Sequence, residues 1–90
     1  MKAPTKMFAD MLDALSNQPG EFARTKSSNH RYETQIHRMM MDSILIVMFR
    51  GAEVFEYSTA RGPIFVADDW PFENEMLDEI NRRLKDGKML

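Results

Sequence analysis

The sequence predicts an α+β domain in which a small antiparallel sheet of three to four strands is flanked by an N-terminal and a C-terminal helix. Two observations lead to this prediction. Apolar residues recur with helical spacing near both ends of the chain, and they alternate or run continuously over residues 32–67. The segments are joined by short connections, which favour the antiparallel order α-β-β-β-(β)-α.

The chain has 90 residues, which predicts a single domain over 1–90, near the lower size limit for independent folding. Its net charge of −2 is too mild for a mimic of nucleic acid and gives no clear basic footprint. The chain contains no cysteine, which excludes disulfides and thiolate metal sites and favours a reducing, cytoplasmic setting. The longest apolar run, 44–49, is too short to cross a membrane, and no signal peptide is recognised.

Residues 4–17 are expected to form the first helix, because their apolar side chains fall on one face. Those side chains are Phe8, Met11, Leu12 and Leu15. Pro4 suits the first turn, where its missing N–H costs no hydrogen bond, and Pro19-Gly20 ends the helix. The polar face of this helix is acidic, which argues against binding to a membrane surface.

Residues 20–31 are expected to be a mobile surface connector. Their sequence, GEFARTKSSNHR, is polar in its second part and shows no apolar periodicity. Phe22 is expected to hold the first part of the connector against the core. The segment is the most basic in the chain, and its basic side chains either contact phosphate or are solvated.

Residues 32–67 are expected to form the sheet, because the apolar period changes to two at Tyr32. The first strand runs from Tyr32 into Met40 or Met41. Further strands are predicted at 44–50, 52–58 and 64–67, the last of them a short edge strand that follows Pro63. Arg50-Gly51 is expected to form a tight turn.

The strand at 44–50 is apolar on both faces, which predicts a central strand that is covered on both sides. One face consists of Ile44, Ile46 and Met48, and the other of Leu45, Val47 and Phe49. In the next strand, regular alternation places Val54 and Glu56 on one face. It places Glu53, Phe55 and Tyr57 on the other.

Residues 70–86 are expected to form the second helix, with Asp69 as its N-cap and Pro71 in its first turn. Acidic residues crowd its first half and basic residues its second half, which complements the helix dipole. Pairs at i,i+4 are expected between Asp78 and Arg82 and between Glu79 and Arg83.

No catalytic, cofactor-binding or metal-binding residue is predicted, because the common motifs for these chemistries are missing from the sequence. Two candidate sets of residues would make the chain an enzyme, the first as a small metal-dependent hydrolase and the second through nucleophilic catalysis. His30, Glu33 and His37 would share a face only on a helix, and this segment is expected to be loop and strand. A Ser/His/Asp set from Ser27, Ser28, His37 and Asp42 has the right residue types, but only geometry identifies such a set.

The two helices are expected to cover one face of the sheet and to leave an apolar face for a partner. We predict that this interface consists of Leu45, Val47, Phe49, Phe55 and Tyr57, although the sequence does not decide which face meets the helices. A second copy in a homodimer, or a different protein, would cover it. The hypothesis is a small protein-binding regulator or inhibitor, of the general character of phage and mobile-element proteins that act on host machinery.

The alternative function is nucleic-acid binding through the basic connector and the arginines of the sheet. The residues for this alternative are Arg24, Lys26, Arg31, Arg38, Arg50 and Arg61. Glutamates are interleaved with them, and mixed charge is typical of a solvated sheet face. This argues against a continuous basic surface, so protein binding is the favoured prediction.

Overall fold

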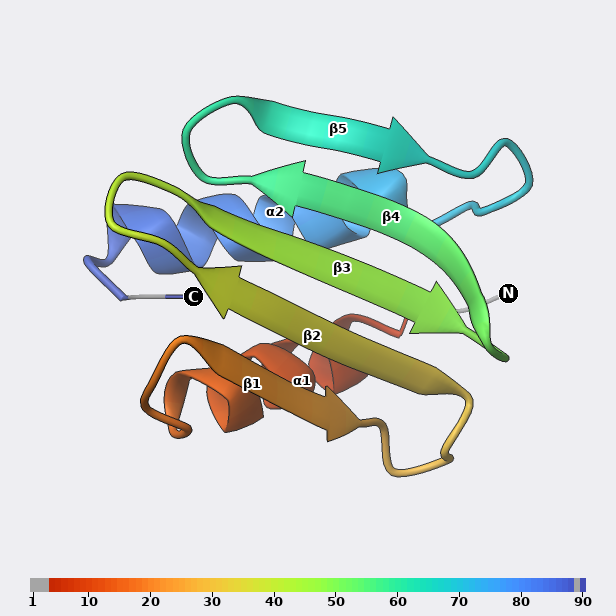
Figure 1. Cartoon of the computed structure of the whole chain (residues 1–90). Coiled ribbons are helices and arrows are strands. Elements are labelled where there is room, and N and C mark those ends of the chain that lie inside the picture. The colour runs from red at the N-terminus through yellow and green to blue at the C-terminus, as the bar shows by residue number, and fades with distance from the viewer. Residues whose placement is uncertain (1–3, 89) are drawn as a thin grey trace.

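Five antiparallel strands follow one another across the sheet in chain order, with one helix before them and one after them (Figure 1). The computed structural model describes residues 4–88 and residue 90, so residues 1–3 and 89 of the predicted domain lie outside the described part. The predicted α+β class is confirmed. The elements are α1 (Thr5–Ser16), β1 (Phe22–Lys26), β2 (Tyr32–Arg38), β3 (Ser43–Phe49), β4 (Ala52–Ser58), β5 (Gly62–Val66) and α2 (Glu73–Lys85).

Both helices lie on the same side of the sheet, behind the strands in the view of Figure 1. α1 contacts β1, β2 and α2. The core fills the space between this helical layer and one face of the sheet. From α1 it receives Phe8, Met11, Leu12 and Leu15, the four residues whose spacing predicts the helix. Burying a large apolar side chain of this kind contributes about 1.5–3 kcal/mol to folding.

The connector expected at 20–31 contains β1, and this strand raises the count from the predicted three or four to five. β1 pairs with β2 from Phe22 opposite His37 to Lys26 opposite Glu33. Phe22, expected to reach the core, is 69% exposed, and within β1 only Ala23 is buried. A single small buried residue produces no alternating apolar signal, so the pairing with β2 determines this strand.

An irregular pairing between β3 and β4 overturns the regular alternation predicted for β4. Val47 lies opposite Phe55 and Met48 lies opposite Glu53, so Val54 is the extra residue of a β-bulge. Val54 and Phe55 are consecutive in sequence, yet both are buried. The glutamates on either side of this pair therefore both lie on the face that is turned away from the helices.

The hairpin between β3 and β4 closes through Arg50 and Gly51, as predicted. Both residues have a positive φ, 51° at Arg50 and 82° at Gly51, as the common two-residue hairpin turn requires. The Arg50 N–H donates to the Arg31 carbonyl at 2.7 Å, which ties this turn to the β1–β2 loop. The Arg50 guanidinium lies over the Phe49 ring, 5.3 Å from its centroid.

The second helix begins later than predicted, at Glu73, and Asp69 is not its N-cap. Phe72 occupies the N-cap position and makes no capping hydrogen bond through its side chain. The chain from Trp70 to Phe72 consequently runs past the end of the core before the helix starts. Trp70 is buried there, at 7% exposure.

The ion pairs of α2 also differ from the predicted i,i+4 pairs. Arg82 pairs with Glu79, three residues earlier, at 3.1 Å, and not with Asp78, four residues earlier. Arg83 reaches across to Asp13 and to the Ser16 hydroxyl of α1. Arg83 is only 5% exposed. A buried guanidinium needs an anionic partner, and here the partner comes from the neighbouring helix, so the pair joins the two helices.

Arg38, one of the residues predicted for nucleic-acid binding, is a structural residue on the helix side of β2. Its guanidinium donates to the carbonyl oxygens of Leu15, Gln18, Gly20 and Leu90 at 2.7–2.9 Å. The first three of these carbonyls belong to the end of α1 and the turn that follows. Arg38 therefore joins that turn and the end of the chain to the sheet.

We expect Arg38→Met to lower the free energy of unfolding by about 2–4 kcal/mol, because it removes a charge-assisted donor set and leaves carbonyls without partners. Arg38→Lys should restore little of this loss, because an ammonium cannot reproduce the planar fork of donors. Urea unfolding measures both effects. Arg61→Met, at an exposed turn, is the control. Equal unfolding midpoints for Arg38→Lys and the parent chain would contradict the assignment.

Candidate functional site

The face of the sheet that is turned away from the helices is not covered by any described element, and it faces the viewer in Figure 1. We call it the open face. Its side chains form rows that cross the strands in register, with neighbours about 5 Å apart. The middle row is Arg24, Gln35, Ile46, Glu56 and Phe65. The flanking rows are Lys26, Glu33, Met48 and Glu53 on one side, and Phe22, His37 and Ile44 on the other.

An apolar stripe runs along the middle of the open face on β3. Its members, Ile44, Ile46 and Met48, are partly exposed between the side chains of the neighbouring strands. Phe65 on β5 is 44% exposed, and Phe22 on β1 stacks on the ring of His37 with 4.2 Å between centroids. The open face therefore presents apolar surface on three of its five strands.

Charge is distributed unequally on the two sides of this stripe. β1 contributes the cations Arg24 and Lys26, and β4 contributes the carboxylates Glu53 and Glu56. Glu33 on β2, directly opposite Lys26, lowers the positive charge of the β1 side. The open face thus has a basic edge, an apolar centre and an acidic side.

The bulge in β4 places Glu53 and Glu56 close together on the open face. A hydrogen bond to Glu56 raises the pKa of Glu53, and partial burial and the negative charge of Glu56 act in the same direction. Two carboxyl groups that share a proton carry less charge than two separate ones. The acidic side of the open face therefore becomes more negative as the pH rises.

The structure corrects the choice of face for the predicted interface. Leu45, Val47, Phe55 and Tyr57 are buried against the helices, and Phe49 is partly buried against the same core. The prediction of these five residues as a partner surface is wrong for the folded domain, because the helices cover them. The stripe Ile44, Ile46 and Met48 is the set that the helices leave uncovered.

The six basic residues predicted for nucleic-acid binding do not form one surface. Lys26, Arg31 and Arg50 meet, together with His30, around a cavity of about 260 Å³ at one end of the sheet. Arg24 lies beside them on β1. Arg38 is held by backbone carbonyls on the helix side, and Arg61 lies in the β4–β5 turn.

The residues considered for catalysis are engaged in separate local contacts. The Nε2 atom of His37 lies 2.9 Å from Glu21, and the Ser27 hydroxyl donates to Asn29. Asp42 accepts hydrogen bonds from the Ser58 hydroxyl and from other groups of the β4–β5 turn. Those bonds, chiefly the one from Ser58, lower the pKa of Asp42. These contacts fix loops and do not assemble a nucleophile with a base.

Over residues 4–88 and 90, no cluster of three or more His, Cys, Asp and Glu side chains has the geometry of a metal site. None of the described helices is long and apolar enough to cross a bilayer. The comparisons with known proteins add no assignment, since no family model, no curated protein and no solved structure matches the chain.

Sequence reasoning missed the acidic side of the open face and the contribution of β1. The acidic side depends on the bulge at Val54, which brings Glu53 to the same face as Glu56. Val54 and Phe55, two large apolar neighbours after a glutamate, are the only sign of it in the sequence. β1 was assigned to a connector, although its Arg24 and Lys26 were recognised as candidate binding residues.

We predict that Glu53→Gln stabilises the protein at neutral pH and has little effect at acidic pH. A raised pKa means that folded Glu53 holds its proton at a higher pH than the unfolded chain does. Its contribution to stability is therefore present at acidic pH and is lost as the pH rises through the folded pKa. Thermal melting of the variant and the parent chain, from acidic to neutral pH, measures the effect. Asp78→Asn, on the exposed side of α2, is the control, and a pH-independent difference for Glu53→Gln would refute the prediction.

Proposed function

We propose that the protein is a non-enzymatic interaction module, a small regulator or inhibitor, and that the open face of its sheet binds protein. The observation that carries the proposal is the uncovered stripe of Ile44, Ile46 and Met48 on β3, with Phe22 and Phe65 exposed on the two outer strands. An apolar patch of this kind, rimmed by polar residues, is typical of protein interfaces. The partner that the charges of the open face favour is a second copy of the chain.

The argument for a second copy rests on the order of the charges across the strands. A two-fold axis that lies over β3 and runs parallel to it turns one open face onto another and reverses the strand order. Ile46 then meets Ile46 of the second copy on the axis. Arg24 faces Phe65 of the second copy. From this position the long side chain of Arg24 reaches toward Glu56 of the second copy. β1 lies over β5 of the second copy and β2 lies over its β4, so Arg24 approaches Glu56 twice, while Glu33 and Glu53 face each other across the interface.

The other two-fold arrangement of the same faces has poor electrostatics. With the axis perpendicular to the strands, β1 would lie over β1 and β4 over β4. The cations of β1 would then lie over the cations of the second copy's β1, and the carboxylates of β4 over those of its β4. Like charges placed opposite each other are destabilising. Charge therefore favours the parallel axis.

The size of the open face predicts a weak dimer. Five strands spaced about 4.8 Å apart, each rising about 3.4 Å per residue, give a face roughly 24 Å across and roughly 20 Å long. This is somewhat smaller than the about 800 Å² that each partner contributes to a standard interface. We therefore expect an equilibrium between monomer and dimer at micromolar concentrations.

The nucleic-acid alternative has one supporting observation, the meeting of Lys26, Arg31 and Arg50 at one end of the sheet. The engagement of Arg38 by backbone carbonyls and the distance of Arg61 in sequence and sheet position weaken it. Protein binding therefore has more support. The compartment that we propose is the cytoplasm, because a cysteine-free domain without disulfides suits a reducing environment.

The first test of the second-copy proposal is Ile46→Lys. This substitution places a charge at the centre of the interface but leaves the core untouched, so the protein should stay folded and become monomeric. Light scattering after size exclusion, over rising protein concentration, measures the mass, and circular dichroism measures the fold. Ile46→Val, which keeps the apolar surface, should still dimerise.

Val47→Lys is the matched control on the neighbouring residue. Val47 is fully buried under the helices, so a lysine there should unfold the domain. If the parent chain is monomeric at every concentration, a second copy is the wrong partner. In that case the open face would need a different protein.

Charge exchange tests the direction of the axis. One variant carries Arg24→Glu and the other carries Glu56→Lys, the two side chains that the parallel axis brings within reach of each other. Each alone should dimerise at least tenfold more weakly than the parent chain, because like charges meet across its own interface. Mixed in equal amounts, the two variants should form a heterodimer in which both contacts are complementary. Native mass spectrometry distinguishes the species. A mixture that dimerises as weakly as each variant alone would exclude the parallel axis.

A further inference from the structure

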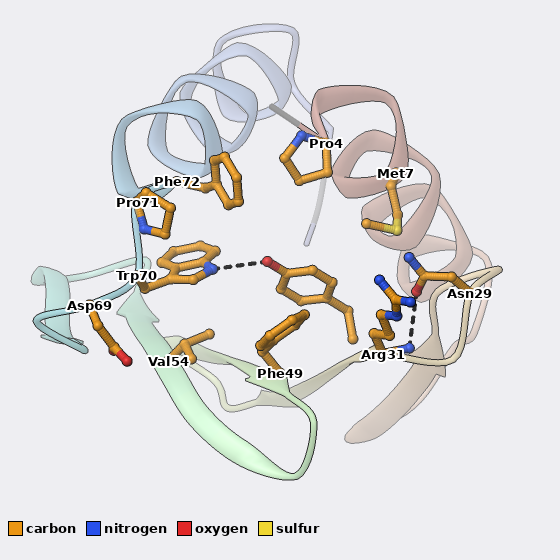
Figure 2. Close-up of a pocket in the computed structure, with 11 residues that line it drawn as sticks. Pro4, Met7, Asn29, Arg31, Phe49, Val54, Asp69, Trp70, Pro71 and Phe72 are labelled. Carbon is orange, nitrogen blue, oxygen red and sulfur yellow. Dashed lines mark hydrogen bonds between the residues drawn. The ribbon is translucent and has the colours of Figure 1, made fainter. Parts of the chain in front are cut away.

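A pocket of about 420 Å³ opens at one end of the core, on the helix side of the sheet, where it is separate from the open face. The start of α1, the segment that leads into α2, the β1–β2 loop and the strand ends at the β3–β4 hairpin surround it (Figure 2). Its walls are largely aromatic and apolar, with Phe49, Trp70 and Phe72 on different sides. Its volume lies within the range of small-molecule sites, about 300–1,000 Å³.

The hydroxyl of Tyr32 lies in this pocket with its donor unused. It accepts a hydrogen bond from Trp70 Nε1 at 3.0 Å, the bond drawn in Figure 2, and no residue in 4–88 or 90 accepts its proton. Tyr32 is 5% exposed, and burial raises its pKa, partly offset by the bond from Trp70. The hydroxyl therefore stays protonated and offers a buried hydrogen-bond donor.

The polar groups on one rim of the pocket are donors as well. Asn29 Oδ1 accepts from the Ser27 hydroxyl at 2.6 Å and from the Arg31 N–H at 3.0 Å, so the amide NH₂ is what Asn29 has left to offer. The exposed guanidinium of Arg31 lies beside it. Figure 2 places Asp69 on the opposite rim, with its carboxylate directed away from the pocket.

We propose that this pocket binds a small aromatic carboxylate that has a second hydrogen-bond acceptor between its ring and its carboxylate. The ring would pack among Trp70, Phe49 and Phe72, as aromatic walls favour. The second acceptor would take the proton of Tyr32. The carboxylate would take the donors of Arg31 and Asn29, since a guanidinium matches a carboxylate in charge and in geometry. This site is independent of the proposed interface.

Trp70 provides the readout, because it is the only tryptophan in the chain and it lines the pocket. The probe is 3-phenyllactate, whose hydroxyl is the second acceptor, titrated into the full chain under selective excitation of tryptophan. We expect a saturable change in emission. 3-Phenyllactamide, which lacks the charge, should bind about fivefold or more weakly. 3-Phenylpropionate, which lacks the acceptor for Tyr32, should bind about threefold to tenfold more weakly.

Arg31→Gln tests the charge recognition directly. It should make the acid and its amide bind with equal affinity, while Arg61→Gln, the same change at an exposed turn far from the pocket, should preserve the preference for the acid. Circular dichroism verifies the fold of both variants. The proposal is overturned by the lack of any saturable change, by equal binding of acid and amide to the parent chain, or by a preference that survives Arg31→Gln.

Discussion

Both helices pack on one face of a five-stranded sheet, and nearly every other feature of the molecule depends on this one-sided packing. The inner face of β3 meets the helices through Leu45 and Val47, both of which are fully buried. Its outer face has side chains of the same apolar character, and no element among residues 4–88 covers them. The surplus apolar surface is therefore a direct consequence of the number of elements and their positions.

The bulge in β4 adapts the sheet to this packing. Two consecutive residues, Val54 and Phe55, turn toward the helices, so the extra residue of the bulge adds an apolar side chain to the core. The same irregularity moves Glu53 to the outer face beside Glu56, where the pKa of Glu53 is raised. One local change in pairing therefore contributes to the core on one side and to the acidic part of the open face on the other.

The sequence predicted the parts of the fold in which several large side chains repeat a period. The apolar face of α1 and the continuous apolar run of β3 are of this kind, and both elements form where they were predicted, although the described residues cover only one of the two faces of β3. β1 escaped prediction because its one buried residue is Ala23, and the choice of interface face failed because β3 is apolar on both sides. Which face meets the helices depends on contacts with α1 and α2 that lie far away in sequence, and a period of two within one strand does not contain that information.

The late start of α2 connects the one-sided core to the pocket. A helix beginning at residue 70 would carry the side chain of Trp70 around its first turn, whereas the turns that precede Glu73 direct the indole N–H to the hydroxyl of Tyr32. Phe8 packs against both rings from α1, so the aromatic cluster is held from the helical layer and from the sheet. With the first turn of α2 displaced along the chain, the end of the core stays open. The aromatic rings at this end of the core therefore line a pocket. The polar groups that the pocket offers to a ligand, from Tyr32, Asn29 and Arg31, are hydrogen-bond donors.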